Sequence, residues 1–491
     1  MRRIVLLASV VTSSAFTLAV ASCVGDAPAN PDSGSADSGP SATDSGPDTQ
    51  PPPDTGPSDS GSCVIPDAAA PGSLDLSFTS GVKTVAGGFR ARAVAVDPSG
   101  AIYVAGAAST GTCTQYDIAL VRFQKDGALD PVFNPGNQPR CLNVDVSDVG
   151  NAVAILPNGS ALVGGASAHP LNQSATVAQN FGTAMLAAFL PDAGNDLGFN
   201  GNGHRGLLAD AAAGASSFMN NGGTVVVSSA FSTAHGVAVS ANKIAVVGSN
   251  AIFNLNFPAL GSTGYVQILN KDGTTDPNFN SGAALADPTV AGFWGVTFDP
   301  NGALIAVGQT NAAPGQQKLA VRAWSPDGKS KTINVDVPLA GGFLGRSIVL
   351  LDDGRIVVAG PSNLTGASFD GPLAVTRLLP NGNVDMQFNG GVPLTLPLKS
   401  DGYLQSSSLA KLCNNTVLVA GRAEVPNQDL GLTRVTPDGK LDMAFGMNGV
   451  ARQPIVGDEV PIGAAQDPVT GKVVVVGRDT SANPVLARFN P

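Results

Sequence analysis

Short apolar runs separated by turn residues recur along the chain from residue 66 to the C-terminus. The runs are four to seven residues long, rich in Val, Ile and Leu, and bounded by Gly, Pro, Asn and Asp, as in AVAVDPSGAIYVAG and GVTFDPNGALIAVG. Runs of this length and composition are typical of β-strands joined by tight turns. Because no segment of this region has the 3.6-residue periodicity of an amphipathic helix, the pattern predicts an all-β fold.

These apolar runs belong to a longer repeat. The first half of each unit is a strand, a turn containing glycine, and a second strand that ends in a further glycine. The closing glycines are Gly106, Gly165, Gly248, Gly308, Gly360, Gly421 and Gly477. The second half is a third strand such as DIALVRF, an Asp-Gly or Asn-Gly turn, the phrase Asp-x-x-Phe, and a fourth strand. Units of this size with four antiparallel strands each predict a β-propeller or a related array.

The two ends of the repetitive region carry complementary halves of one unit. Residues 72–82, GSLDLSFTSGV, contain the second-half phrase with no first half before them, and the last unit stops at Pro491, where that phrase should follow. An open solenoid would need atypical caps at both ends instead. We therefore predict a seven-bladed β-propeller over residues 66–491, with about four antiparallel strands per blade, closed by the N-terminal segment completing the last blade.

The repeat resembles a known family. DGKLDMAFGMNGV, preceded by LGLTRVTP, is similar to the delta-60 repeat, a β-propeller repeat found in exported bacterial proteins. The resemblance covers residues 72–491, most closely in the first, fifth and sixth units and least in the second half of the fourth. It implies the fold and the repeat, but no shared activity, because propellers host many unrelated functions.

Three residue types recur about once per unit and are candidate site residues. The phrase supplies Asp75, Asp130, Asp196, Asp276, Asp385 and Asp442, with a degraded slot after Asp327, and also Phe133, Phe279, Phe388 and Phe445; the third strands supply Arg122, Arg377, Arg434 and Arg488, with Arg322 one place out of register. A residue needed once per blade is most simply part of the blade. We expect the Phe to fill the space between sheets and the Asp to bond turn amides. Each Arg either pairs with a recurrent Asp, which we favour, or contributes to a ring that holds an anion.

The N-terminus predicts export and anchoring. Arg2 and Arg3 precede the apolar run IVLLASVV and the small residues of VASC, which end at Cys23. This pattern is typical of a secretory leader, and VASC resembles the lipobox of bacterial lipoproteins. The resemblance implies a signal peptide over 1–22 and a lipid on Cys23; an ordinary leader with an incidental cysteine is the alternative. Residues 23–65 lack a set of apolar residues able to form a core, so we expect a disordered Asp/Ser/Pro/Gly tether, although a glycosylated stalk is also compatible.

Once Cys23 is lipidated, four cysteines remain. An even number in an exported protein predicts disulfides. Cys113 and Cys141 lie in loops of one repeat and are the first candidate pair, which leaves Cys63 and Cys413 as the second. No Cys-x-x-Cys spacing indicates a metal site, and we predict no metal or cofactor.

Charge and motifs narrow the class of function. The net charge is −10, and no basic stripe is present, so we predict no nucleic-acid partner. Motifs of metalloproteases, serine hydrolases, P-loop enzymes, EF-hands and haem proteins are absent, and we assign no catalytic residue. All three histidines, His169, His204 and His235, are assigned to the second unit, whose 83-residue spacing indicates a long surface loop.

The sequence therefore favours a non-enzymatic, lipid-anchored propeller of the cell envelope that binds a protein or another surface ligand. The membrane is contacted through the lipid on Cys23, and we expect the outer membrane or cell surface of a Gram-negative bacterium. The alternatives are an envelope hydrolase or lyase that uses propeller-face loops, with Asp and His of the second unit as candidates, and a purely structural envelope component.

Overall fold

The computed structural model describes residues 70–78, 82–84, 88–109, 113, 116–144, 147–170, 180–192, 194–207, 218–219, 225–226, 228–254, 257–364, 371–400, 408–412, 414–424, 428–454, 460–479 and 484–491. The chain divides into two compact units, 1–58 and 59–491, and all of these residues lie in the second. The described residues form antiparallel strands and short 3-10 turns, with no α-helix among them. The all-β prediction is confirmed. None of the described residues forms a helix with the length and apolar character needed to cross a bilayer.

The strands fall into groups of four that follow the sequence repeat. The first groups are β2 (Phe89–Val96), β3 (Ile102–Ala108), β4 (Asp117–Phe123), β5 (Arg140–Leu142); then β6 (Ser147–Ile155), β7 (Ala161–Pro170), β8 (Asn180–Phe189), β9 (His204–Gly206); then β12 (Ser228–Val239), β13 (Lys243–Asn254), β14 (Phe257–Asn270), β15 (Leu285–Asp287). The next are β16 (Val290–Phe298), β17 (Leu304–Thr310), β18 (Leu319–Trp324), β19 (Lys331–Val337); then β20 (Ser347–Leu350), β21 (Ile356–Pro361), β22 (Pro372–Leu378), β23 (Leu394–Lys399); then β24 (Ser408–Lys411), β25 (Val417–Ala423), β26 (Asp429–Val435), β27 (Val450–Gln453). The last group combines β28 (Val460–Gln466), β29 (Val473–Arg478) and β30 (Pro484–Phe489) with β1 (Val82–Thr84) from the start of the described chain.

Some groups are joined at their edges. A single parallel pairing, Phe231 with Gly182, links β12 to β8, and a single antiparallel pairing, Lys399 with Arg422, links β23 to β25. Each of these contacts merges two groups into one eight-stranded sheet. A separate two-stranded hairpin pairs β10 (Phe218–Met219) with β11 (Val225–Val226).

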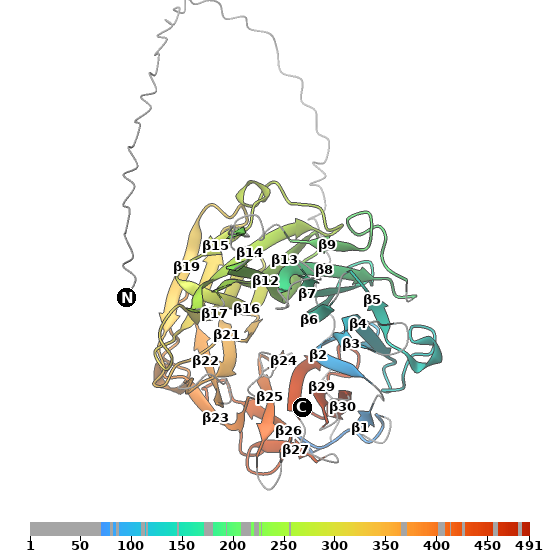
Figure 1. Ribbon diagram of the computed structural model, residues 1–491. Coiled ribbons are helices and arrows are strands. Elements are labelled where there is room, and N and C mark those ends of the chain that lie inside the picture. Colours follow the sequence, from blue (N-terminus) through green and yellow to red (C-terminus); the bar gives the residue numbers. More distant parts are fainter. Residues whose placement is uncertain are drawn as a thin grey trace, which may run out of the picture. The chain divides into compact units, whose positions relative to one another are not determined.

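The two ends of the described chain share a sheet. β1 pairs antiparallel with β30, with Val82 opposite Ala487 and Thr84 opposite Val485. Leu74 forms a further bridge with Phe489. The first strand of each group lies beside the first strand of the next, and β28 lies beside β2. Figure 1 labels the first strands β2, β6, β12 and β16.

Apolar clusters fill the spaces between neighbouring groups. One cluster joins β2, β3 and β4 to β28, β29 and β30, and the next along the chain joins β2, β3 and β4 to β6, β7 and β8. Side chains from the two faces of each sheet therefore enter two different clusters, which explains why the central strands read as continuous apolar runs. This packing holds the first strands side by side. It therefore also positions those side chains of the first strands that point towards the centre.

Candidate functional site

The recurrent Asp and Phe of the repeated phrase have structural roles, as predicted. The carboxylate of Asp385 accepts a hydrogen bond from the N–H of Gln387 at 2.9 Å, and the same local bond recurs in the other copies. Phe388 is buried and lies so close to Gly439, in the turn of the next group, that a Cβ on this glycine would approach the ring within 3 Å. The same approach is made by Phe78 to Gly127. These Phe rings therefore pack one sheet against the turn of the next.

The recurrent arginines pair with the recurrent aspartates, which confirms the favoured interpretation. The Nε–Oδ2 distance is 2.7 Å for Arg377 with Asp385, and the pairs Arg434–Asp442 and Arg488–Asp75 have the same distance. The Arg122–Asp130 pair is longer, at 3.5 Å, and Arg322 instead contacts Asp287 and Asp336. These arginines lie in the third strands of five of the groups, and some of them also contact the neighbouring group. Nη1 of Arg488, for example, donates to the Lys125 carbonyl of the first group at 2.6 Å.

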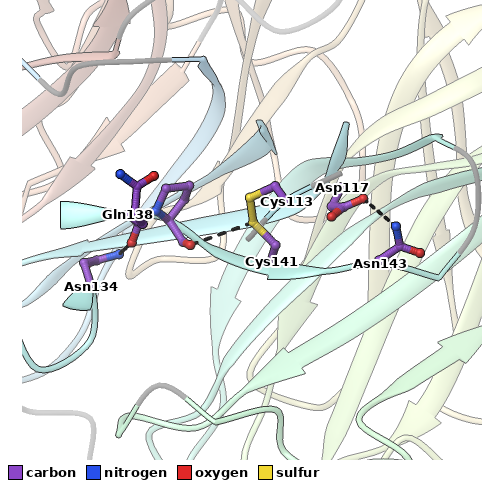
Figure 2. Close-up of a disulfide and its surroundings, with 7 residues drawn as sticks. Cys113, Asp117, Asn134, Gln138, Cys141 and Asn143 are labelled. Atoms are coloured by element: carbon purple, nitrogen blue, oxygen red, sulfur yellow. Dashed lines mark hydrogen bonds between the residues drawn. A yellow bond between two sulfur atoms is a disulfide. The ribbon is translucent and has the colours of Figure 1, made fainter. Parts of the chain in front are cut away.

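A disulfide links Cys113 to Cys141, the first of the two predicted pairs (Figure 2). The Cα atoms are 5.5 Å apart, and the bond ties the segment before β4 to β5. Beside it, the amide of Asn143 donates to Asp117 at 3.0 Å. Cys113, Asp117 and Cys141 have potential ligand atoms within 4.8 Å of one another. Because both sulfurs are in the disulfide, they are not available as the thiolates that a metal would require.

Several predicted residues lie outside the described residues. They are the lipidation candidate Cys23 and the second pair of cysteines, Cys63 and Cys413. His169 lies in β7, and its side chain is likewise outside the described part. The assignment of His235 to the second unit was wrong: His204 lies in β9, the fourth strand of its group, but His235 lies in β12, the first strand of the next group.

Five of the described first strands, β2, β6, β12, β16 and β28, contain a bulge that turns one side chain towards the centre. In β2, Ala91 pairs with Gly106 and Ala93 with Ala105, so Arg92 is an extra, unpaired residue. The register shifts in the same way around Asn151, His235, Trp294 and Ile462. Arg346 holds the corresponding place just before β20, where its N–H donates to the Ala359 carbonyl. A bulge re-aims a side chain and is often found next to functional sites.

The closing glycine of the repeat makes this bulge possible. A Cβ on Gly106 would collide with the backbone carbonyl of Arg90, the residue two places before the bulge. The closing glycines Gly165, Gly248, Gly308 and Gly360 face the equivalent carbonyl in their own groups. The glycine seen in the sequence is therefore a backbone requirement, because no side chain fits where the bulged strand crosses its partner.

The bulged residues line a cavity of about 190 Å³. We call five of them the collar: Arg92, Asn151, His235, Trp294 and Arg346. Beyond the collar the same first strands contribute an apolar layer, Val94, Val153, Val237, Val296 and Ile348. The cavity is therefore lined by polar and aromatic collar side chains and by an apolar layer, and no acidic side chain is among the described residues that line it.

Collar side chains hold one another in place. Arg92 Nη1 donates to Asn151 Oδ1 at 2.8 Å, and Asn151 Nδ2 donates to the Ala234 carbonyl at 3.1 Å. The His235 ring stacks on Trp294 with centroids 5.3 Å apart and planes 20° from parallel. On Trp294, the Arg346 guanidinium lies 5.7 Å from the ring centroid. These contacts connect strands from five groups, so the collar is one assembly built from distant parts of the sequence.

Electrostatically, the collar is cationic and its histidine is neutral. Burial, together with Arg478 and Arg90, lowers the pKa of Arg92 to about 10, which leaves it charged at neutral pH. Burial and the charges of Arg346 and Arg92 lower the pKa of His235 to about 3. The Nε2 atom of the neutral His235 ring is hydrogen-bonded to Ser249 Oγ at 2.8 Å. The site can therefore attract an anion and offer hydrogen bonds, but its histidine is uncharged at neutral pH.

Sequence reasoning missed the collar, although a signal was present. Each bulged residue stands five places before the residue that opens the first turn, as Arg92 does before Asp97 and Trp294 before Asp299. The residue at this position changes from unit to unit, as it does at several other positions of the repeat. Repetition drew attention to the Arg and Asp series, which are structural, and away from a position that varies.

A family model described as a domain of unknown function (DUF5122) β-propeller matches residues 98–133 and 351–388. Both segments run from the first turn of a unit to the Phe of the repeated phrase. The fold is a β-propeller. No curated protein matches the chain.

Solved structures of varied function are similar to this propeller. A protein of unknown function from Dyadobacter fermentans is 13% identical, with a TM-score of 0.41, and the match covers 83% of this chain and 98% of that one. The Myceliophteria thermophila Cps50 (Swd1) β-propeller domain is 9% identical, with a TM-score of 0.41 and coverage of 83% and 99%. Trypanosoma rangeli sialidase is 10% identical, with a TM-score of 0.36 and coverage of 69% and 53%. These values are too low to transfer an activity.

Proposed function

We propose that the protein is a non-enzymatic binding propeller of the cell envelope and that its ligand enters at the collar. One observation carries this proposal: the residues Arg92, Asn151, His235, Trp294 and Arg346, which come from five successive groups, converge on one cavity. Different polar and aromatic groups converging on one cavity are typical of a binding site.

The collar supports binding more than hydrolysis or elimination. General acid–base catalysis needs a group whose pKa lies near the working pH. His235 has a pKa of about 3, and the described lining residues include no carboxylate that could act with it. The cavity therefore offers hydrogen bonds and positive charge without a base of suitable strength.

The groups of strands are proposed to be seven blades of a closed ring built from delta-60 repeats. Support comes from the pairing of β1 with β30 and from the apolar clusters that join every group to the next, including the last to the first. The ion pair between Arg488 and Asp75 joins the same two ends. Closure of this kind keeps strand edges paired and would hold the collar residues in fixed positions.

We further propose that a lipid on Cys23 anchors the chain and that the residues up to 65 act as a tether to the outer membrane or cell surface. The motif VASC after a basic start and an apolar run supports this proposal. Detergent phase partitioning of the full-length chain and of Cys23→Ser, with mass spectrometry of the N-terminal peptide, tests it. Recovery of both proteins in the aqueous phase with no added lipid mass would contradict it.

The binding proposal is tested by retention from envelope extracts. Immobilised full-length protein and a Trp294→Ala variant are incubated with the same extract, and retained molecules are identified by mass spectrometry. We expect at least one species to be retained by the native chain and lost by the variant. Equal retention by both proteins would place binding elsewhere or favour a purely structural role. Leu76→Ala, a change at an exposed apolar residue of the repeated phrase, serves as the control.

A further inference from the structure

We infer that the collar binds a small monocarboxylate with a compact apolar part, the carboxylate on Arg92 and the apolar part against the valine and isoleucine layer. The inference deepens the proposed function and rests on it. It names the chemistry of the ligand, not a particular molecule.

The charge requirement comes from arginines that lack an acidic partner. Among the described residues, neither Arg90 nor Arg92 contacts a carboxylate: Arg92 bonds the neutral amide of Asn151, and Arg90 bonds the Tyr116 hydroxyl at 3.2 Å. In this protein the blade arginines have carboxylate partners, as Arg377 has Asp385. A half-buried guanidinium beside other cations, with no anion in contact, is an arrangement that an anionic ligand would stabilise.

The Arg92 guanidinium has capacity left for such a ligand. Its Nη1 is committed to Asn151, and guanidinium carries five N–H donors in a planar fork. Asn151 is itself fixed by the Ala234 carbonyl. This arrangement orients the fork of Arg92 before a ligand arrives, which reduces the entropy that binding would cost.

The apolar requirement comes from the layer beyond the collar. Val94 and Val153 follow two places after Arg92 and Asn151 on the same strands, and Val237, Val296 and Ile348 complete the layer. A purely hydrated ion, such as phosphate, would leave this surface unused. A ligand with one charged and one apolar end matches both layers, because burial of apolar surface adds to the ion pair.

Cavity size limits the apolar part. The volume is about 190 Å³, and a cavity of about 150 Å³ is known to accept benzene in another protein. A six-membered ring bearing one carboxylate therefore fits this scale, whereas typical drug-sized ligands need about 300 Å³ or more. Benzoate is the simplest probe of this class.

Tryptophan fluorescence gives a direct readout. The chain has two tryptophans; Trp324 is buried in the cluster between two sheets, so a Trp324→Phe background leaves Trp294 of the collar as the sole emitter. The full-length protein in this background is titrated with benzoate, with benzamide, which has the same shape but no charge, and with phosphate, which has charge but no apolar part. Benzamide also controls for optical effects of the aromatic ring.

We expect saturable quenching by benzoate, with binding at least about tenfold tighter than that of benzamide or phosphate, since one charge-assisted interaction is at stake. Arg92→Gln should weaken benzoate binding at least about tenfold, and Arg355→Gln, an arginine in the turn before β21, should leave it unchanged. Equal binding of benzamide, equal binding of phosphate, no effect of Arg92→Gln, or no binding of benzoate would each overturn the inference. Collar-dependent retention from envelope extracts would still support the proposed function in those cases.

Discussion

The ion pair between Arg488 and Asp75 joins the last strand of the chain to its first described segment, and we predict that Asp75→Asn weakens the fold in a pH-dependent way. Asp75 is 5% exposed and accepts hydrogen bonds from Arg488 Nε at 2.7 Å and Ser77 Oγ at 2.7 Å. Lys472 Nζ lies 3.0 Å away. Burial alone would raise the pKa of Asp75, but the bonds from Ser77, Lys472 and Arg488 outweigh it and hold the pKa at about 2.

The lowered pKa of Asp75 gives the size of the stabilisation that Asp75→Asn removes. The ordinary value is 3.8, so the ionised carboxylate stabilises the folded chain by about 2 kcal/mol at pH 7. The loss should stay near that value, below the ~3–5 kcal/mol typical of an unpaired buried charge, because Arg488 keeps a second partner, Asp467, at 3.2 Å. Since the folded pKa is the lower one, the stabilisation is full above pH ~4 and is lost as the pH falls towards 2.

Urea unfolding at several pH values measures the effect. The free energy of unfolding should differ between the native chain and Asp75→Asn by about 2 kcal/mol at pH 7 and by less than about 0.5 kcal/mol at pH 2. The matched control is Asp442→Asn, in the same phrase, where the Asp442 side chain is 22% exposed and the loss should be about 0–1 kcal/mol. An equal, pH-independent loss in both variants would refute the reasoning, as would no loss at Asp75.

Three further predictions follow from the backbone, the disulfide and the collar. Gly248→Ala should lower the free energy of unfolding by about 1–3 kcal/mol, because the new Cβ meets a backbone carbonyl. The control Gly206→Ala should change this free energy little, because its Cβ would meet only a methyl group at 3.6 Å. Similar urea midpoints for the two variants would count against the role of the glycine in the bulge. Replacing Cys113 and Cys141 together by Ser should cost about 3–4 kcal/mol in the chain-entropy account, given their 28-residue separation. Thermal melting against the oxidised native chain measures this loss, and the reduced native chain should melt like the variant. The NMR signals of His235 should not titrate between pH 5 and 8, because its pKa is about 3; a midpoint in that range would remove the case for a neutral collar histidine.

Strand positions and the blade contacts could be predicted from the sequence because they obey local rules. Apolar runs of a few residues between Gly, Asn and Asp leave few alternatives to strands and tight turns. The recurring spacing of Arg377 and Asp385, eight positions apart across one turn, also places them on adjacent strands. Their pairing then follows from the hairpin alone, with no knowledge of the tertiary structure.

The collar could not be predicted in this way because no local rule brings its members together. Arg92 and Arg346 are separated by 254 positions, and they meet in one cavity only because the first strands lie around a common centre. The direction of their side chains depends on a bulge in the first strand. The recurrent sequence feature linked to this bulge is a glycine on the partner strand. The composition of the collar is visible in the sequence, but its convergence depends on how the first strands lie beside one another.

Two kinds of position therefore have different roles in this chain: the recurrent Arg and Asp of the blades, and the bulged residues that line the cavity. Arg and Asp of the blades recur in several units because they make contacts that support the fold, as the bond from Arg488 to the Lys125 carbonyl illustrates. Such contacts hold the first strands in place, and a closing glycine accommodates the bulge in five of the groups. The bulged position is then free to vary, since its side chain points away from both neighbouring sheets and into the cavity. A repeat protein of this design can acquire a ligand by changing single residues at one position per unit, without altering the contacts that maintain the fold.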